Sequence, residues 1–183
     1  MTSVIHNGVV HPTHSALILA VGEAEPVVAA HRERLDAAAG WGVPAHITVL
    51  YPFLPPADID EHVLAVLTGT AASVPAFFCA LQRVDWFGDS VLWLAPAPAT
   101  PIITLTAAVA AHFPGCQPYG GQFTEIVPHL TIGHDHPRAD LEAAAADITA
   151  HLPIHARISS LRLITGRPEP GGSWATRAEF PLG

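Results

Sequence analysis

"HITVLYPF" (residues 46–53) and "HLTIGHDH" (residues 129–136) begin with the same pattern: a histidine, an aliphatic residue, a threonine and a second aliphatic residue. Side chains on a β-strand alternate between its two faces, so residues two positions apart lie on the same face. In a strand, each segment would therefore present its histidine and threonine together and turn both aliphatic residues toward a core. We expect two matching strands, each exposing one imidazole and one hydroxyl.

This pairing suits chemistry at a phosphate that both strands share. In an in-line displacement at phosphorus, the attacking and leaving oxygens lie on opposite sides of the reacting atom. If His46 and His129 meet across a groove, the neutral one can remove a proton from the attacking water and the protonated one can donate a proton to the departing alkoxide. The hydroxyls of Thr48 and Thr131 can donate hydrogen bonds to the non-bridging oxygens. This chemistry requires no metal ion.

The composition is that of a folded domain with few positive charges. Half of the 183 residues are hydrophobic, enough for one domain or for two small lobes that share an interface. The net charge of −8, in a chain that has arginine but no lysine, argues against binding long nucleic acid. No secretory signal or bilayer-spanning stretch is visible, so we expect a cytoplasmic monomer with no membrane contact. Cys79 and Cys116 are expected to be reduced structural thiols.

Runs of aliphatic and β-branched residues predict strands, and apolar residues spaced three or four apart predict helices. Strands are expected at 16–21, at 46–53, on both sides of "FGDS" within 76–98, from residue 129, and as a hairpin within 154–183 with its turn in "RPEPGG". Helices are expected at 23–40, 58–67, 101–113 and 138–153. A loop over 115–128 leads into the second motif.

The order of these elements repeats along the chain. Each motif strand is followed by a helix and then by a hairpin that contains a tryptophan, Trp93 in the first half and Trp174 in the second. The tryptophans follow the motif histidines by 47 and 45 residues respectively. A repeat of this length is typical of duplicated lobes related by an approximate two-fold axis.

The predicted fold class is α+β, with two pseudo-symmetric lobes of antiparallel sheet and helices packed on the outside. We expect residues 1–183 to form a single bilobal domain. The lobe with the first motif is expected around 41–98 and the lobe with the second around 120–183. The N-terminal strand and helix, within 14–40, are expected to complete the sheet.

With both motifs in place, the sequence resembles the two-histidine (2H) phosphoesterase superfamily, and within it the 2'-5' RNA ligase-like (LigT-like) family. The signature of this family is a pair of histidine, hydrophobic, threonine or serine, hydrophobic motifs. "HITV" (46–49) and "HLTI" (129–132) satisfy it at every position. The flanking segments "LYPF", "LWLAPAP" and "PYGGQFTEIVPHLTI" are also similar, and the likeness runs from about Ser15 to Phe180.

The resemblance implies a bilobal fold with a groove between the lobes and cofactor-free, metal-independent hydrolysis of 2',3'-cyclic phosphates or 2'-5' linkages. By motif match, His46 and His129 are the catalytic pair, and Thr48 and Thr131 bind the phosphate. Family members that act on RNA ends often carry basic residues near the groove, whereas no arginine stands next to either motif here. This departure favours a mononucleotide or another small cyclic phosphate over RNA. Which histidine is the acid stays open, because the approximate symmetry makes the two roles exchangeable.

Aromatic residues near the motifs are candidates for substrate contact. Tyr51 and Tyr119 are placed to contact a base or a phosphate, although packing is the favoured interpretation. Phe53, Phe123 and Trp93 are candidates for stacking on a nucleobase, and packing in the core or between lobes is again favoured.

Two alternatives come from other functional classes. A non-catalytic module on the same fold would bind a nucleotide or cyclic phosphate without turnover. A zinc hydrolase would use His129, His134 and His136 with Asp135. Against zinc, His129 and His134 point to opposite faces if the segment is a strand.

Overall fold

The computed structural model describes residues 11–117 and 126–183. Its strands are β1 (His14–Ala20), β2 (His46–Leu50), β3 (Phe77–Phe87), β4 (Val91–Ala97), β5 (Leu130–His134), β6 (Ile154–Ile158), β7 (Ser160–Gly166) and β8 (Trp174–Pro181). Its helices are α1 (Glu25–Leu35), α2 (Ala37–Gly40), α3 (Glu61–Ala72), α4 (Thr100–His112) and α5 (Arg138–Thr149), with 3-10 turns η1 (Gly22–Ala24) and η2 (Pro56–Asp58).

Within these residues the strands form two four-stranded sheets. Sheet A has the order β2-β1-β7-β8, and sheet B has the order β5-β4-β3-β6. Every neighbouring pair of strands runs antiparallel. The α+β class expected from the sequence is therefore confirmed.

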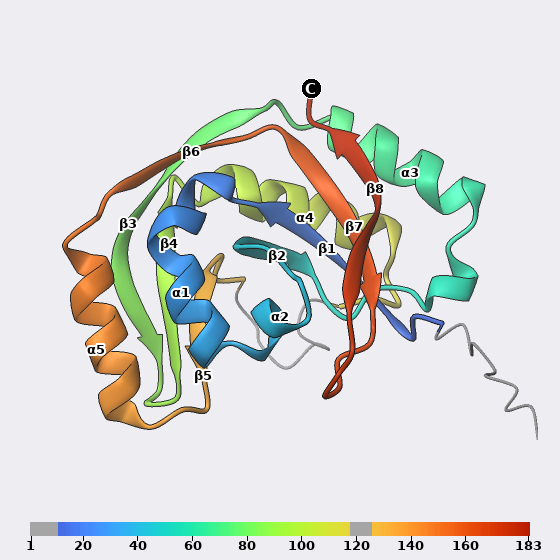
Figure 1. Ribbon diagram of the computed structural model, residues 1–183. Helices are drawn as coiled ribbons and strands as arrows, with labels where there is room; N and C mark the ends of the chain where they lie inside the picture. Colours follow the sequence, from blue (N-terminus) through green and yellow to red (C-terminus); the bar gives the residue numbers. More distant parts are fainter. Residues whose placement is uncertain (1–10, 118–125) are drawn as a thin grey trace, which may run out of the picture.

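The helices tie the two sheets together (Figure 1). Helix α1 follows β1 of sheet A but packs against β5 of sheet B, and α4 follows β4 of sheet B but packs against β2 of sheet A. Helix α3 contacts β8 and α4, whereas α5 contacts β3 and α1. Each motif strand is thus an edge strand covered by a helix that comes from the opposite sheet, and β2 and β5 contact each other.

Each sheet takes strands from both of the sequence ranges expected for the two lobes. The range 41–98 is divided, because β2 belongs to sheet A while the β3–β4 hairpin pairs with β5 in sheet B. The range 120–183 is divided in the same way between β5 and β6 in sheet B and β7 and β8 in sheet A. The N-terminal strand β1 is an inner strand of sheet A, and its helix α1 covers the other sheet.

The repeat is consequently built differently from the predicted one. Both motif strands pair with the strand that precedes them in the chain: β2 pairs with β1 and β5 pairs with β4. The repeating unit is strand, helix, motif strand, helix, and it starts at β1 and again at β4. Trp93 lies on β4 beside a motif strand, whereas Trp174 lies on the edge strand β8, so the two tryptophans are not equivalent.

Two aspartates set helix starts that the hydrophobic pattern did not locate. The side chain of Asp60 accepts a hydrogen bond from the backbone N–H of Val63, as an N-cap does, so α3 begins later than predicted. Asp36 has an extended backbone and accepts a hydrogen bond from the N–H of Ala38. The helix predicted over 23–40 is therefore broken into η1, α1 and α2.

The alternation of side chains in both motifs is as predicted. Ile47 and Val49 on β2, and Leu130 and Ile132 on β5, are buried in one hydrophobic core that includes residues from both sheets. His46, Thr48, His129 and Thr131 are half-buried on the other face of their strands. Because the aliphatic side chains of each motif are buried in the core, its histidine and threonine side chains lie on the opposite, partly exposed face of the strand.

Both cysteines are free thiols, in line with the structural role predicted for them. Cys79 is buried, and burial together with the charge of Glu23 raises the pKa of its thiol to about 11. Burial also raises the pKa of the Cys116 thiol. In the described part of the chain, no helix has the length and apolar character needed to cross a membrane.

Gly133, directly after the second motif, allows two helices to approach β5 closely. A Cβ atom there would lie 2.6 Å from Cδ2 of Leu141 on α5 and 2.8 Å from Cβ of Leu35 on α1. We predict that Gly133→Ala lowers the free energy of unfolding by about 1–3 kcal/mol because it overpacks this contact. The matched change Gly69→Ala, in α3 with open space at its Cβ position, is expected to raise it by about 0.5–1 kcal/mol. Urea denaturation of both variants checks the prediction, and equal effects would contradict it.

Candidate active site

The two His-x-Thr pairs lie on adjoining edge strands. His46 and Thr48 are on β2, where they pair with Ala20 and Ile18 of β1. His129 immediately precedes β5, and Thr131 lies on β5 opposite Trp93. The strands β2 and β5 contact each other, and a positive charge on His129 lowers the pKa of His46. The fold therefore brings the two motif strands together.

Both histidines are held by the same hydrogen bond. Nδ1 of His46 lies 2.8 Å from the carbonyl oxygen of Pro44, and Nδ1 of His129 lies 2.7 Å from the carbonyl oxygen of Val127. A carbonyl oxygen only accepts hydrogen bonds, so Nδ1 carries the proton in both rings. In the neutral form, Nε2 is then the basic nitrogen of each imidazole. Both rings are thus oriented and fixed in the same tautomer by the backbone two residues earlier.

The surroundings of the two imidazoles differ. The pKa of His46 is lowered to about 4, mainly by burial and next by the nearby guanidinium of Arg32. The carboxylate of Asp36 raises this pKa, but by less than Arg32 lowers it. Burial also lowers the pKa of His129 below the usual 6.5, by a smaller amount, and the hydrogen bond to Val127 opposes this change. His46 is therefore the weaker base of the two.

Aromatic rings form one wall of the second motif. The ring of His129 meets Phe87 edge-on, with centroids 4.9 Å apart, and meets Trp93 at 5.8 Å. Phe87 and Trp93 are stacked on each other at 4.7 Å. Trp93 is buried, so packing is the interpretation that its geometry supports.

The other aromatic candidates divide between core and site. Phe53 is buried in the core, where its ring meets Phe113 edge-on at 5.0 Å, so it packs rather than facing a ligand. Tyr51 lines a hollow beside His46 and meets Trp174 edge-on at 6.2 Å. Tyr119 and Phe123 lie outside the described residues.

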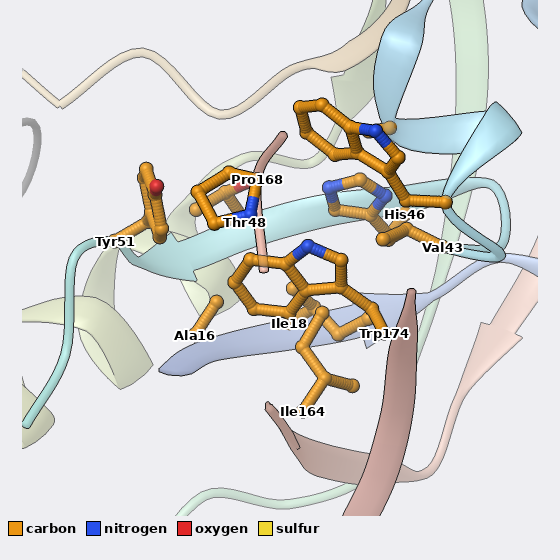
Figure 2. A pocket seen from close by; sticks show the side chains of 11 residues that line it. Ala16, Ile18, Val43, His46, Thr48, Tyr51, Ile164, Pro168 and Trp174 are labelled. Atoms are coloured by element: carbon orange, nitrogen blue, oxygen red, sulfur yellow. The ribbon is translucent and has the colours of Figure 1, made fainter. Parts of the chain in front are cut away.

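The hollow beside the first motif has a volume of about 160 Å³ and a mainly apolar lining. Figure 2 shows His46 and Thr48 on β2 next to it, with Tyr51, Pro168 and Trp174 around it. Its other lining residues are Ala16, Ile18, Ala38, Trp41, Val43 and Ile164. Trp174 Nε1 is buried and has no hydrogen-bond partner among the described residues. The hollow accordingly offers mainly apolar surface next to the first motif.

Sequence reasoning missed three residues of this site. Trp41 and Trp174 line the hollow, and the backbone N–H of Trp174 donates to the carbonyl oxygen of Trp41, which joins β8 to the segment before β2. Arg32, which stands 14 residues before His46, lies close enough to influence its pKa. No local motif marks these residues, because Trp41 and Trp174 meet from segments far apart in the sequence and Arg32 acts from the helix that precedes the first motif.

The zinc alternative finds no support in the geometry. Within residues 11–117 and 126–183, no three histidine, cysteine, aspartate or glutamate side chains are grouped so that they could hold a metal ion. His134 is exposed at the end of β5 and pairs with its neighbour Asp135 at 3.2 Å.

Comparison with known proteins identifies the family of this chain. A family model described as the 2'-5' RNA ligase superfamily matches residues 20–168. The chain therefore belongs to the 2'-5' RNA ligase superfamily and is a LigT-like protein. No curated protein matches the sequence.

Several solved structures share this fold at low sequence identity. E. coli LigT complexed with NADP+ is 17% identical, with a TM-score of 0.58 over 94% of this chain and 99% of LigT. E. coli LigT complexed with 3'-AMP is 16% identical, with a TM-score of 0.59 over the same shares. The protein TT0787 of Thermus thermophilus is 15% identical, with a TM-score of 0.61 over 92% of this chain and 97% of that protein. The LigT-like fold expected from the sequence is confirmed.

The environments of the two imidazoles lead to a direct prediction. In the protein without substrate, the ring of His46 should titrate near pH 4. The ring of His129 should titrate at a higher pH than His46 but below 6.5. A pH titration of the histidine ring signals by NMR, assigned with His46→Gln and His129→Gln, measures both values. A pKa of 6.5 or above for His46 would contradict the prediction.

Proposed function

We propose that this protein is a metal-independent phosphodiesterase that hydrolyses 2',3'-cyclic phosphates of small nucleotides by general acid and base catalysis. The observation that carries the proposal is the pair of imidazoles on adjoining edge strands, each with Nδ1 bonded to a backbone carbonyl and each followed by a threonine on the same face. Two basic Nε2 atoms fixed in this way supply the proton acceptor and the proton donor that an in-line displacement needs.

In the proposed reaction, Nε2 of His46 removes a proton from water as the water oxygen forms a bond to phosphorus. The bond from phosphorus to one ribose oxygen breaks, and Nε2–H of His129 protonates that oxygen. The product is a phosphate monoester with a free hydroxyl, and a proton returned from His46 to His129 through solvent restores the enzyme. The hydroxyls of Thr48 and Thr131 donate hydrogen bonds to the non-bridging oxygens, where the charge resides.

The assignment of base and acid follows from the different surroundings of the two rings. A pKa of about 4 keeps His46 neutral at mildly acidic and neutral pH, as a general base requires. The smaller change at His129 leaves a larger protonated fraction at the same pH, as a general acid requires. Near-symmetric motifs thus perform opposite roles because their neighbours differ.

The hollow beside the first motif supports a nucleotide as the substrate. Its volume of about 160 Å³ is close to that of an engineered cavity of about 150 Å³ that binds benzene, so it accommodates one aromatic ring. Tyr51 and Trp174 offer aromatic surfaces on which a base can pack, largely without regard to its identity. E. coli LigT, which shares the fold, has been solved with NADP+, 3'-AMP and ATP.

The charges around the sheets favour a small substrate over an RNA chain. Thr48 on β2 and Arg162 on β7 both pair with Ile18 of β1, so they lie on the same face of sheet A. The guanidinium of Arg162, however, forms an ion pair with Glu179 at 3.3 Å. Arg83 on sheet B pairs with Asp85 at 3.1 Å. A guanidinium that is already paired contributes less to binding successive phosphates, and long nucleic acid requires many such contacts.

Replacing either histidine tests the proposal. We expect His46→Ala and His129→Ala each to lower kcat for 2',3'-cyclic AMP by about 10²- to 10⁴-fold, because each removes one proton-transfer group. The melting temperature of both variants should stay close to that of the unchanged protein, and EDTA should not reduce activity. Activity close to normal in either folded variant would contradict the mechanism. Binding of the cyclic nucleotide by calorimetry without turnover would indicate the non-catalytic module instead.

The same two variants separate the base from the acid. A p-nitrophenyl ester of a 2'-deoxynucleoside 3'-phosphate has no 2'-hydroxyl that could attack phosphorus, and its leaving group departs without protonation, so its hydrolysis does not need the general acid. On this substrate, His129→Ala should recover most of its lost activity, whereas His46→Ala should not. The opposite pattern would reverse the assignment, and it would leave the proposed reaction in place.

Replacing Trp174 tests the hollow as the binding site for the base. We expect Trp174→Ala to lower kcat/KM for 2',3'-cyclic AMP by about 5- to 100-fold, the range expected for the loss of one stacked base. Glycerol 1,2-cyclic phosphate, which has no base, should be hydrolysed by this variant as well as by the unchanged protein. Phe78→Ala is the matched control, because Phe78 is an exposed aromatic residue on β3, 72% accessible and not part of the hollow. An equal loss on both substrates would refute the base-binding role.

A further inference from the structure

Arg32 is a buried cation beside the first motif. Its side chain is 2% exposed, and it belongs to the largest fully buried side chains of the described residues. Nε and Nη2 donate to Oδ2 of Asp36 at 3.1 and 2.8 Å, and Nη1 donates to the carbonyl oxygen of Val43 at 3.3 Å. Arg32 therefore connects α1 to the start of α2 and to the chain directly before β2.

The segment of residues 43–45, which leads into His46, is held at each of its residues. Arg32 holds the carbonyl of Val43, and the carbonyl of Pro44 accepts the hydrogen bond from the His46 ring. The backbone N–H of Ala45 donates to the Glu25 carboxylate at 2.6 Å. The ring of His46 is therefore oriented by a carbonyl in a segment that Arg32 and Glu25 hold in place from α1.

The positive charge of Arg32 also affects the pKa of His46. Within the ion pair, the guanidinium lowers the pKa of His46 by more than the Asp36 carboxylate raises it. Among the described residues, the other titratable groups near His46 are His129, which also lowers its pKa, Tyr51, which lines the same hollow, and Glu25, whose carboxylate accepts from the N–H of Ala45. A buried charge acts over short distances through a medium of low dielectric constant, so solvent screens this effect little.

We propose that Arg32 is a positioning residue that holds the 43–45 segment beneath His46 and keeps His46 the neutral partner of the histidine pair. The role is distinct from substrate binding, because Arg32 is buried and does not line the hollow. This inference rests on the proposed function only for the effect of Arg32 on catalysis. The effect of Arg32 on the pKa of His46 is measured without any substrate.

Four variants separate the charge of Arg32 from its hydrogen bonds. Arg32→Gln removes the charge, whereas Arg32→Lys keeps the charge but loses the planar set of donors. Asp36→Asn removes the opposing charge, and asparagine still serves as an N-cap for α2. Arg34→Gln is the matched control, because Arg34 is an exposed arginine on the same helix and the change in net charge is the same.

The first readout is the pH titration of the His46 ring by NMR in the protein without substrate. We expect Arg32→Gln to raise the pKa of His46 by about one unit or more, toward 6.5, because a repelling cation is lost. Arg32→Lys and Arg34→Gln should leave it near 4, and Asp36→Asn should not raise it. Loosened packing alone would raise the pKa in both Arg32→Gln and Asp36→Asn, so the difference between them identifies the charge effect.

The second readout is the pH dependence of kcat/KM for 2',3'-cyclic AMP. Arg32→Gln and Arg32→Lys should both lower kcat by about tenfold, because neither holds Val43 and Asp36 as a guanidinium does. Only Arg32→Gln should move the acidic limb of the profile to higher pH. Circular dichroism and thermal melting confirm that each variant is folded. If Arg32→Gln does not fold, Arg32→Lys alone tests the inference. In this variant the pKa of His46 must stay unchanged while kcat falls.

Three outcomes overturn the inference. The first is a folded Arg32→Gln in which the pKa of His46 is unchanged. The second is an equal shift in Arg34→Gln, and the third is an Arg32→Lys with full kcat. A protein that hydrolyses no cyclic phosphate refutes the proposed function instead, and the NMR titration still decides whether Arg32 controls His46.

Discussion

The site depends on an exchange of helices between the two sheets. Helix α1 leaves sheet A and packs against β5, and α4 leaves sheet B and packs against β2. Because each motif strand is an edge strand covered by the helix of the other sheet, the sheets cannot separate without exposing the common core. This constraint brings together two histidines that are 83 residues apart in the chain.

Similar backbones and different neighbours together explain how two copies of one motif can perform different tasks. The backbone repeats the hydrogen bond from Nδ1 to a carbonyl, so both rings are in the same tautomer. The surroundings differ, because a guanidinium and a carboxylate lie near His46, whereas Phe87 and Trp93 pack against His129. The protonation states of near-identical groups are thus set by contacts outside the repeated strands.

The burial pattern of the two motifs was readable from the sequence, because the signals for it are local. The alternation of polar and aliphatic residues in "HITV" and "HLTI" predicted which side chains are buried, and the structure agrees. The composition of the two sheets was not readable from the sequence, because strand pairing is not a local property. The β3–β4 hairpin has the same pattern whether it joins β2 or β5, and only the packing of whole sheets selects its partner.

The sequence by itself determined the α+β class, the two motif strands and the identity of the histidines and threonines in them, because the periodicity of a strand is set by neighbouring residues. The tertiary structure alone decided that Arg32 lies beside His46 and that Trp41 and Trp174 line a hollow next to it. These residues reach the site through a buried ion pair and through cross-strand contacts between distant segments. Their geometry follows from how the helices and sheets pack, and no short stretch of sequence encodes it.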